Sequence, residues 1–396
     1  MTTAMLALTL GSFGLECCPF CSLQGGGKRL VDKVQEAQYV ACGRLSNSRL
    51  NANPLPDEPL GTTDMKVLKV VKNHAKAPKA ESAKLQAYMP AAEKEAGDYL
   101  VFADVRDGAL VPFSAMPLQQ NFLEYLESTM KLENAPSVQR LKHFFAHLDN
   151  PDEEISRDAY MEFAAAPFKD VAGAAKSFDA DKVLKWLRDK NTASYKLGLY
   201  GLMIGVAGRS QDAATLKAIL DDPEQRPLTG CDGLIAGYCL LEPKKGVEFV
   251  GALLCDEKQD FNFRYPALRA ARFLIEEGKA DKPWLMGKLA TQAADNSFGD
   301  LVIDDLRKAK YWDCAAAVFA VENDAKTRSN SMLRRAALRY ALRCPGPAAQ
   351  KFIAAVKAKP AEPNGASGAD RVANEVDALA YEDNVVATPA EAKKKN

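Results

Sequence analysis

The spacing of apolar residues changes once along the chain, near residue 119. Before that point, short runs rich in β-branched and aromatic residues alternate with loops that contain proline and glycine, a pattern typical of strands. We expect these runs to form the strands of a small barrel or sandwich of about five strands. The ranges are 38–45, 62–73, 84–90 and 97–113, and the segment 28–38 has helical patterning.

Two local details sharpen this expectation. Asp107-Gly108 lies between two β-rich runs, and this dipeptide favours the positive φ angles of a tight hairpin turn. In the run 62–73, strict alternation predicts that Met65, Val67 and Val71 share one face with Lys69.

From residue 119 the apolar period becomes 3.6, which predicts about a dozen helices up to residue 358, joined by short loops. The run 197–208 ("LGLYGLMIGVAG") has 12 residues, against the ~20 that a membrane-spanning helix requires. It therefore predicts a buried helix, and no transmembrane span is expected.

The sequence "DNPDEEISRDAYMEFA" has the signals of a helix start. Asn150 is the expected N-cap, Pro151 the first helical residue and Glu153 the third. Ile155, Ala159 and Phe163 are expected to face the core.

Internal similarity indicates a repeat architecture. "RDAYMEF" at Arg157, "RAARFLI" at Arg269 and "RAALRYA" at Arg335 share an Arg-x-Ala core, and their separations fit repeats of about 33 to 37 residues. With Asp152-x-x-Ile155-x-Arg157-x-Ala159 as the second helix of a pair, the region 119–358 resembles the HEAT-type α-helical repeat family. The resemblance implies an α-solenoid.

The segment 17–118 resembles the netrin/tissue-inhibitor-of-metalloproteinase class of small, oligonucleotide-binding-type (OB-like) barrels. The matching features are cysteines near the start, the strand Val40-Ala41-Cys42-Gly43-Arg44-Leu45, and the runs "MKVLKVVK" and "GDYLVF". The combination of "CPFC", small barrel and helical repeats is similar to a group of uncharacterised exported bacterial proteins. The six-cysteine framework of the animal inhibitors is absent.

The two ends differ from these domains. Residues 1–16 begin with a mostly apolar segment similar to the core of a secretory signal, although it lacks the usual basic residues, and a core strand or helix is the alternative. Residues 359–396 are rich in alanine, proline and polar residues, which predicts a disordered tail in which 372–381 forms at most a transient helix.

Charge balance bears on the class of partner. Lys+Arg and Asp+Glu both total 52, so the net charge is zero. The composition therefore offers no global basic field for nucleic acid or anionic lipid. We expect partners to be other proteins, bound through the helical repeats.

Cysteines are most concentrated in "ECCPFCSLQ", which contains Cys17, Cys18 and Cys21, and Cys42 follows further along the chain. A disulfide, either Cys18–Cys21 or one N-terminal cysteine with Cys42, is favoured if the protein is exported. The alternatives are a catalytic Cys18/Cys21 dithiol, a zinc site from all four cysteines, a lipid-modified Cys17 and free thiols. A dithiol enzyme needs a strand before the motif and a helix directly after it, and a glycine triplet follows instead.

The remaining candidate groups favour structural roles. Cys231, Cys239, Cys255, Cys314 and Cys344 are expected to be small buried residues. His143 and His147 lie four residues apart without the glutamate of an HExxH motif, so core-edge histidines are expected. No metal site and no cofactor are predicted.

The sequence thus predicts a non-enzymatic protein-binding or scaffolding protein of the bacterial cell envelope, exported or periplasmic. A thiol–disulfide oxidoreductase acting through Cys18 and Cys21 is the competing function, and a protease-inhibitor-like module is a third.

Overall fold

A computed structural model describes residues 28–391 except 54, 56–57, 80, 91–96, 120, 228 and 362–364, with side chains as far as residue 384. The chain divides into two compact units, residues 1–179 and 180–396, and each is described by itself. The predicted order, a small barrel followed by an array of helices, is confirmed.

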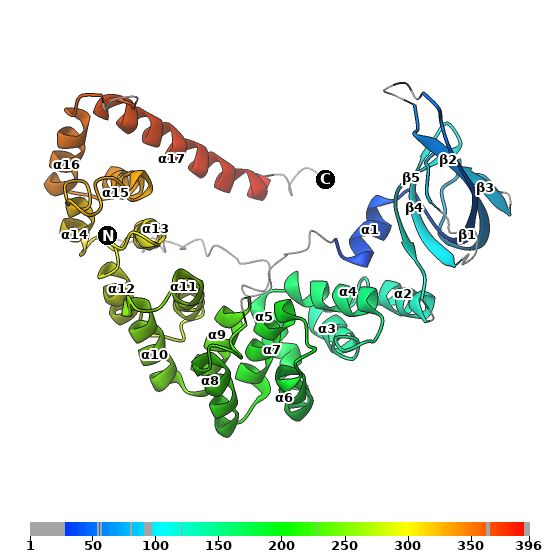
Figure 1. Cartoon of the computed structure of the whole chain (residues 1–396), viewed down its shortest axis with the longest axis horizontal. Coiled ribbons are helices and arrows are strands. Elements are labelled where there is room, and N and C mark those ends of the chain that lie inside the picture. The colour runs from blue at the N-terminus through cyan, green and yellow to red at the C-terminus, as the bar shows by residue number, and fades with distance from the viewer. Residues whose placement is uncertain are drawn as a thin grey trace, which may run out of the picture. The chain divides into compact units, whose positions relative to one another are not determined.

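The first unit begins with a closed five-stranded barrel (Figure 1). The strand order is β1-β2-β3-β5-β4; β1 pairs antiparallel with β2 and β4, and the short β3 pairs parallel with β5. Of the two expected architectures, an OB-like barrel and a sandwich, this closed topology is that of the barrel. The strands are β1 (Tyr39–Leu50), β2 (Gly61–Lys72), β3 (Ser82–Leu85), β4 (Asp98–Arg106) and β5 (Ala109–Pro117).

The β4–β5 connection is the predicted hairpin turn. Asp107 has φ 51° and Gly108 has φ 82°, the left-handed conformations that a two-residue turn of this type requires. Inside the barrel, strand side chains and Ala77 of the β2–β3 connection form one apolar core, made of Tyr39, Ala41, Leu45, Met65, Ala77, Ala83, Leu85, Val101, Ala103 and Leu110.

The predicted face of β2 is wrong at Lys69 because a bulge interrupts the alternation. Cys42 lies opposite Lys69 but Gly43 lies opposite Val67, so Leu68 is the extra residue. Beyond the bulge Val70 lies opposite the core residue Ala41, and a second shift in register follows at Val71. Lys69 therefore points outward, where it forms an ion pair with Glu127.

Helices cover part of the barrel's outer surface. The Lys72 Nζ atom donates to the carbonyl oxygens of Val34 and Gln35 at the end of α1 (Leu30–Glu36), both at 2.9 Å. Glu127, the partner of Lys69, belongs to α2 (Phe122–Lys131). The outward-facing side chains of β1 and β4 that are nevertheless buried are Val40, Cys42, Leu100 and Phe102.

Three more helices complete the first unit: α3 (Ser137–Phe145), α4 (Glu153–Ala164) and α5 (Phe168–Ala175). The N-cap of α4 is Asp152 rather than the predicted Asn150. The Asp152 carboxylate accepts from the backbone N–H of Glu154 at 2.9 Å, whereas the Asn150 side chain accepts from the Asp152 N–H in the preceding turn. The expected inward face of α4, which includes Ile155, is buried.

The second unit is a succession of helices in two layers. In the series that we call the inner layer, α9 contacts α7 and α11, α13 contacts α15, and an ion pair between Arg272 and Asp305 connects α11 with α13. On the other side of the unit, α10 contacts α12 and α14 contacts α16 (Figure 1). The bounds are α6 (Ala180–Arg188), α7 (Ser194–Ala207), a 3-10 turn (Ser210–Asp212), α8 (Ala213–Asp221), α9 (Cys231–Leu241), α10 (Pro243–Cys255), α11 (Phe261–Glu276), α12 (Lys282–Ala290), α13 (Gly299–Lys308), α14 (Ala315–Ala320), α15 (Ser331–Arg343), α16 (Pro347–Lys357) and α17 (Gly368–Glu391).

The predicted buried helix is α7, and it packs on α9 with the two backbones in contact. A Cβ atom on Gly233 would lie 2.1 Å from the Gly198 carbonyl oxygen, and one on Gly237 would lie 2.0 Å from that of Gly201. Such spacing is possible only with glycine at each crossing point. We call this contact the glycine seam, formed by Gly198, Gly201, Gly205, Gly233 and Gly237.

The C-terminal segment differs from the predicted disordered tail. Residues 368–391 form α17, which packs on α15 and α16. Glu375 is 5% exposed and Leu379 4%. The apolar content that suggested disorder is indeed low, but ion pairs with α13 and α15 hold this helix in place.

Candidate functional site

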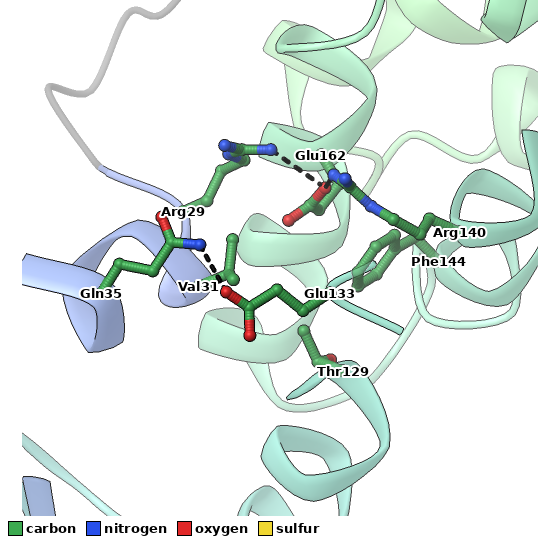
Figure 2. A pocket seen from close by; sticks show the side chains of 8 residues that line it. All are labelled: Arg29, Val31, Gln35, Thr129, Glu133, Arg140, Phe144 and Glu162. Carbon is green, nitrogen blue, oxygen red and sulfur yellow. Dashed lines mark hydrogen bonds and ion pairs between the residues drawn. The ribbon is translucent and has the colours of Figure 1, made fainter. Parts of the chain in front are cut away.

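A polar depression of the first unit lies at the meeting of α1, α2, α3 and α4 (Figure 2). It encloses about 310 Å³, part of it open to solvent. Its lining residues are Arg29, Val31, Gln35, Thr129, Glu133, Arg140, Phe144 and Glu162. α1 is far along the chain from α2, α3 and α4, so the site exists only when this unit is folded.

Glu162 is the centre of the depression, with a side chain only 1% exposed. The guanidinium groups of Arg140 and Arg29 approach the same carboxylate oxygen, at 2.5 and 3.4 Å (Figure 2). Arg29 also donates two hydrogen bonds to Asp32, which raise the pKa of its guanidinium. The two positive charges are thus balanced by two carboxylates, and the geometry is that of an internal clamp between α1, α3 and α4.

Asp158 lies one helical turn before Glu162 and holds α1 from the other side. One carboxylate oxygen accepts from the Leu30 backbone N–H and the other from the Tyr125 hydroxyl, both at 2.6 Å. Burial raises the pKa of Asp158 to about 6, although both hydrogen bonds favour the charged form. Burial also raises the pKa of Tyr125, so its hydroxyl stays protonated and remains a donor.

We expect Asp158→Asn to be more stable than the wild type at pH 7, with a gap that closes near pH 4. Because the folded-state pKa is about 6 and the ordinary value is 3.8, the folded chain binds more protons between these limits, and the stability contributed by Asp158 is present below pH 4 and lost as pH rises through 6. The full effect is on the order of 2–3 kcal/mol. Denaturant unfolding at several pH values measures it.

The comparison between the two proteins isolates Asp158, since every other titrating group is common to both. Asparagine keeps the acceptor for the Leu30 N–H and can donate to the Tyr125 oxygen. A difference in unfolding free energy that stays constant from pH 4 to 7 would show that Asp158 does not titrate in this range.

His143 and His147 lie beside Tyr125 at the edge of the same cluster. Their ring centroids are 4.9 Å apart, and the ring of His147 is 4.9 Å from that of Tyr125. Burial lowers the pKa of both imidazoles. This is the predicted core-edge arrangement. Among the described residues, no group of three or more His, Cys, Asp or Glu side chains is arranged to hold a metal ion.

Of the cysteines predicted to carry chemistry, only Cys42 belongs to the described residues; Cys17, Cys18 and Cys21 lie outside them. Cys42 is 1% exposed on the outer face of β1, and burial raises the pKa of its thiol. No disulfide partner for it is present within the described part of the chain, and a bond to an N-terminal cysteine stays a prediction.

Of the five later cysteines predicted to be buried, three are buried and two are not. Cys231 and Cys239 are buried in α9, and burial raises the pKa of each thiol to about 12. Cys314 is also buried, while Cys255 and Cys344 are partly exposed.

The second unit contains its own buried charge, Arg264 of α11, with a side chain 4% exposed. Its guanidinium donates to the Leu254 carbonyl at 2.8 and 3.2 Å, to Gln292 at 2.9 Å and to Asp295 at 2.8 Å. The group also lies 4.3 Å from the centre of the Phe298 ring. All these contacts connect α10, α11 and the segment before α13, so the arginine is a structural link.

Arginine–carboxylate pairs also connect successive helices of the inner layer. Arg269 of α11 pairs with Asp232 of α9 at 2.7 Å, and Arg272 pairs with Asp305 of α13 at 2.7 Å. Arg335 of α15 pairs with Glu375 of α17. The residues of the repeated Arg-x-Ala signature in this unit therefore connect neighbouring helices.

Two polar residues of the site, Asp158 and Glu162, escaped the sequence analysis. A signal was present, because both lie three residues after a core position of α4, Ile155 and Ala159, and so share its inward face. Carboxylates on an apolar helix face indicate buried partners.

Comparison with known proteins identifies no sequence family. No protein-family model matches the chain, and no curated protein matches it. The solved structure of human deoxyhypusine hydroxylase in complex with glycerol is similar over 62% of this chain and 98% of its own, with 14% identity and a TM-score of 0.27. In the described part of the chain, no helix has both the length and the apolarity to cross a bilayer.

Proposed function

We propose that this chain is a non-enzymatic protein-binding or scaffolding protein of the bacterial cell envelope, and that it binds partner proteins through the surface of its helical array. The observation that carries the proposal is the series α7, α9, α11, α13 and α15, in which α9 packs on α7 and α11, α13 packs on α15, and the Arg272–Asp305 pair connects α11 with α13. Stacked helices of this kind present extended surfaces suited to macromolecules.

The environment of the polar groups supports a structural reading of the interior. Glu162 is held by two arginines, and the charge of Arg264 is taken up by Asp295 and by carbonyl oxygens. These groups already bond to one another within the fold. Partner proteins would therefore be bound by side chains of the surface.

Exposed aromatic side chains are the natural anchors of such a surface. On α11, Phe261 is 40% exposed, and its ring stacks on Tyr265 with centroids 5.3 Å apart. On the barrel, Phe113 is 49% exposed. These two phenylalanines provide a matched comparison between the array and the barrel.

Location in the envelope is supported by the apolar segment at residues 1–15 and by the resemblance of the barrel to the netrin/tissue-inhibitor-of-metalloproteinase class. Cell fractionation and the mass of the native protein test export and removal of residues 1–16.

The test of binding uses the intact chain immobilised against an envelope extract, with wild type, Phe261→Ser and Phe113→Ser compared. We expect the array substitution to lower capture of specific proteins at least several-fold and the barrel substitution to leave it unchanged. Capture that depends on Phe113 alone contradicts the proposal. So does reduction of insulin by the chain that is lost in Cys18→Ser, because that result would identify a dithiol enzyme.

A further inference from the structure

The last helix, α17, is held differently from α13 and α15. α13 and α15 pack through apolar side chains such as Ile303, Leu306 and Leu333, all fully buried. Among the side chains described in α17, Leu379 is the one large apolar residue that is buried. The contact of α17 with α15 therefore contains little apolar surface of the kind that stabilises the rest of the layer.

Arginines take the place of apolar contacts. Arg335, Arg339 and Arg343 are spaced by four residues along α15, so they lie on one face of that helix. Arg307 of α13 adds a fourth guanidinium to the surface beneath α17. We call these four residues the arginine stripe.

The carboxylates of α17 match the arginine stripe. Glu375 pairs with Arg335 at 2.7 Å and with Arg339 at 2.5 Å. Further along α17, Glu382 pairs with Arg307 at 2.9 Å and Asp383 pairs with Arg343. Residues 368–384 contain five carboxylates and one arginine, so this segment is strongly acidic.

The start of α17 has a separate anchor. Glu322, with a side chain 1% exposed, pairs with Arg371 in the first turn of α17 at 2.8 Å and with Lys359 at 3.0 Å. This anchor does not involve the arginine stripe. The remainder of α17 can therefore leave the stripe while its first turn stays attached.

We propose that the arginine stripe is a docking surface for an acidic α-helix of a partner protein, and that α17 occupies it in the free chain. The inference rests on the proposed binding function and names the partner's chemistry. A suitable helix carries carboxylates seven and eight residues after a first one, the spacing of Glu375, Glu382 and Asp383.

The energetics favour exchange of one acidic helix for another. Arg343 is 39% exposed and Asp383 61%, so their ion pair is individually weak. The side chains of Glu375 and Arg307 are each 7% exposed, so their ion pairs must be re-formed with the carboxylates and arginines of the incoming complex. Because a partner helix with matching carboxylates would form the same ion pairs, the main advantage of α17 is its tether, which gives it a high effective concentration. A partner helix with the same carboxylates and a better apolar face would displace it.

The experiment measures binding of a fluorescent synthetic peptide, residues 366–391, to the intact chain. In wild type the attached α17 competes with the peptide. We expect the Glu375→Ala/Glu382→Ala chain to bind the peptide at least about tenfold more tightly, because its own helix competes poorly. The affinity for the peptide should fall as the salt concentration rises from about 0.05 M to about 0.5 M, because salt screens the ion pairs.

Reversing the charge of two residues of the arginine stripe is the decisive test. Arg335→Glu and Arg339→Glu, added to the two alanine substitutions, should abolish peptide binding. If this charge reversal disturbs folding, Arg335→Gln and Arg339→Gln take its place and should weaken peptide binding. Lys351→Glu, at an exposed position of α16, should leave binding unchanged. Peptide binding that survives the loss of both arginines, or that is equal in wild type and the alanine chain, overturns the proposal.

Hydrogen exchange of the wild-type chain gives an independent readout. Amides of residues 372–384 should exchange much faster than those of α15. Equal protection of α15 and α17 would mean that α17 is a permanent part of the array and would refute the inference. In that case Phe261→Ser would still lower the capture of envelope proteins, so this inference can fail while the proposed binding function stands.

Discussion

Gly237→Ala should lower the stability of the second unit by about 3 kcal/mol or more, a fall of roughly 6–12 °C in its thermal midpoint. The added Cβ would lie 2.0 Å from the Gly201 carbonyl oxygen. No side-chain rotation relieves this contact, since both atoms are fixed to backbone. The helices α7 and α9 must separate, which loses contacts on both sides of the glycine seam.

Gly287→Ala is the matched control for this effect. Gly287 is also a glycine in a helix, α12, but no atom lies within 4 Å of the position that its Cβ would take. Alanine there should be neutral or stabilising by about 0.5–1 kcal/mol, because it favours the helix over the unfolded chain. Calorimetry of both variants decides the matter: equal destabilisation would show that the seam is not the cause.

Arg264→Met should cost about 3–5 kcal/mol, because it leaves buried partners without a counterpart. Methionine fills much of the volume, but it cannot donate to the Leu254 carbonyl, to Gln292 or to Asp295. Asp295, with a side chain 13% exposed, would then lack its cation. Unfolding in urea, followed by circular dichroism, measures the loss.

An exposed arginine of the same unit provides the comparison. Arg328 follows α14 and is exposed, so Arg328→Met should change stability by less than about 0.5 kcal/mol. If Arg264→Met were as mild as Arg328→Met, the bonds to Leu254 and Asp295 would contribute nothing to folding.

The sequence predicted those parts of the fold that depend on neighbours along the chain. The Asp107-Gly108 turn follows from two residues, and the change from period 2 to period 3.6 marked the end of the barrel. Predictions failed where a distant contact decides the outcome. The bulge at Leu68 reverses the face of Lys69 through pairing with β1, and α17 is ordered through arginines on α13 and α15.

The partners of the carboxylates in the candidate site could not be predicted from the sequence for the same reason. Asp158 meets the Leu30 N–H across 128 residues of chain, and Glu162 meets Arg29 across 133. Local patterning places both carboxylates on the inward face of α4, but it cannot say which partners they find. The cysteine motif drew attention because its residues are adjacent, whereas the clamp is assembled only by folding.

The glycine seam also determines how the second unit can assemble. The residues between the glycines of α7 are bulky, among them Leu199, Tyr200 and Met203, so a shift of one residue would press a large side chain against the backbone of α9. The pair therefore has a single register and no close competitor, which limits misfolded alternatives. Because each helix of the unit contacts mainly its neighbours, this fixed register gives α10 and α11 a defined surface of α9 on which to pack.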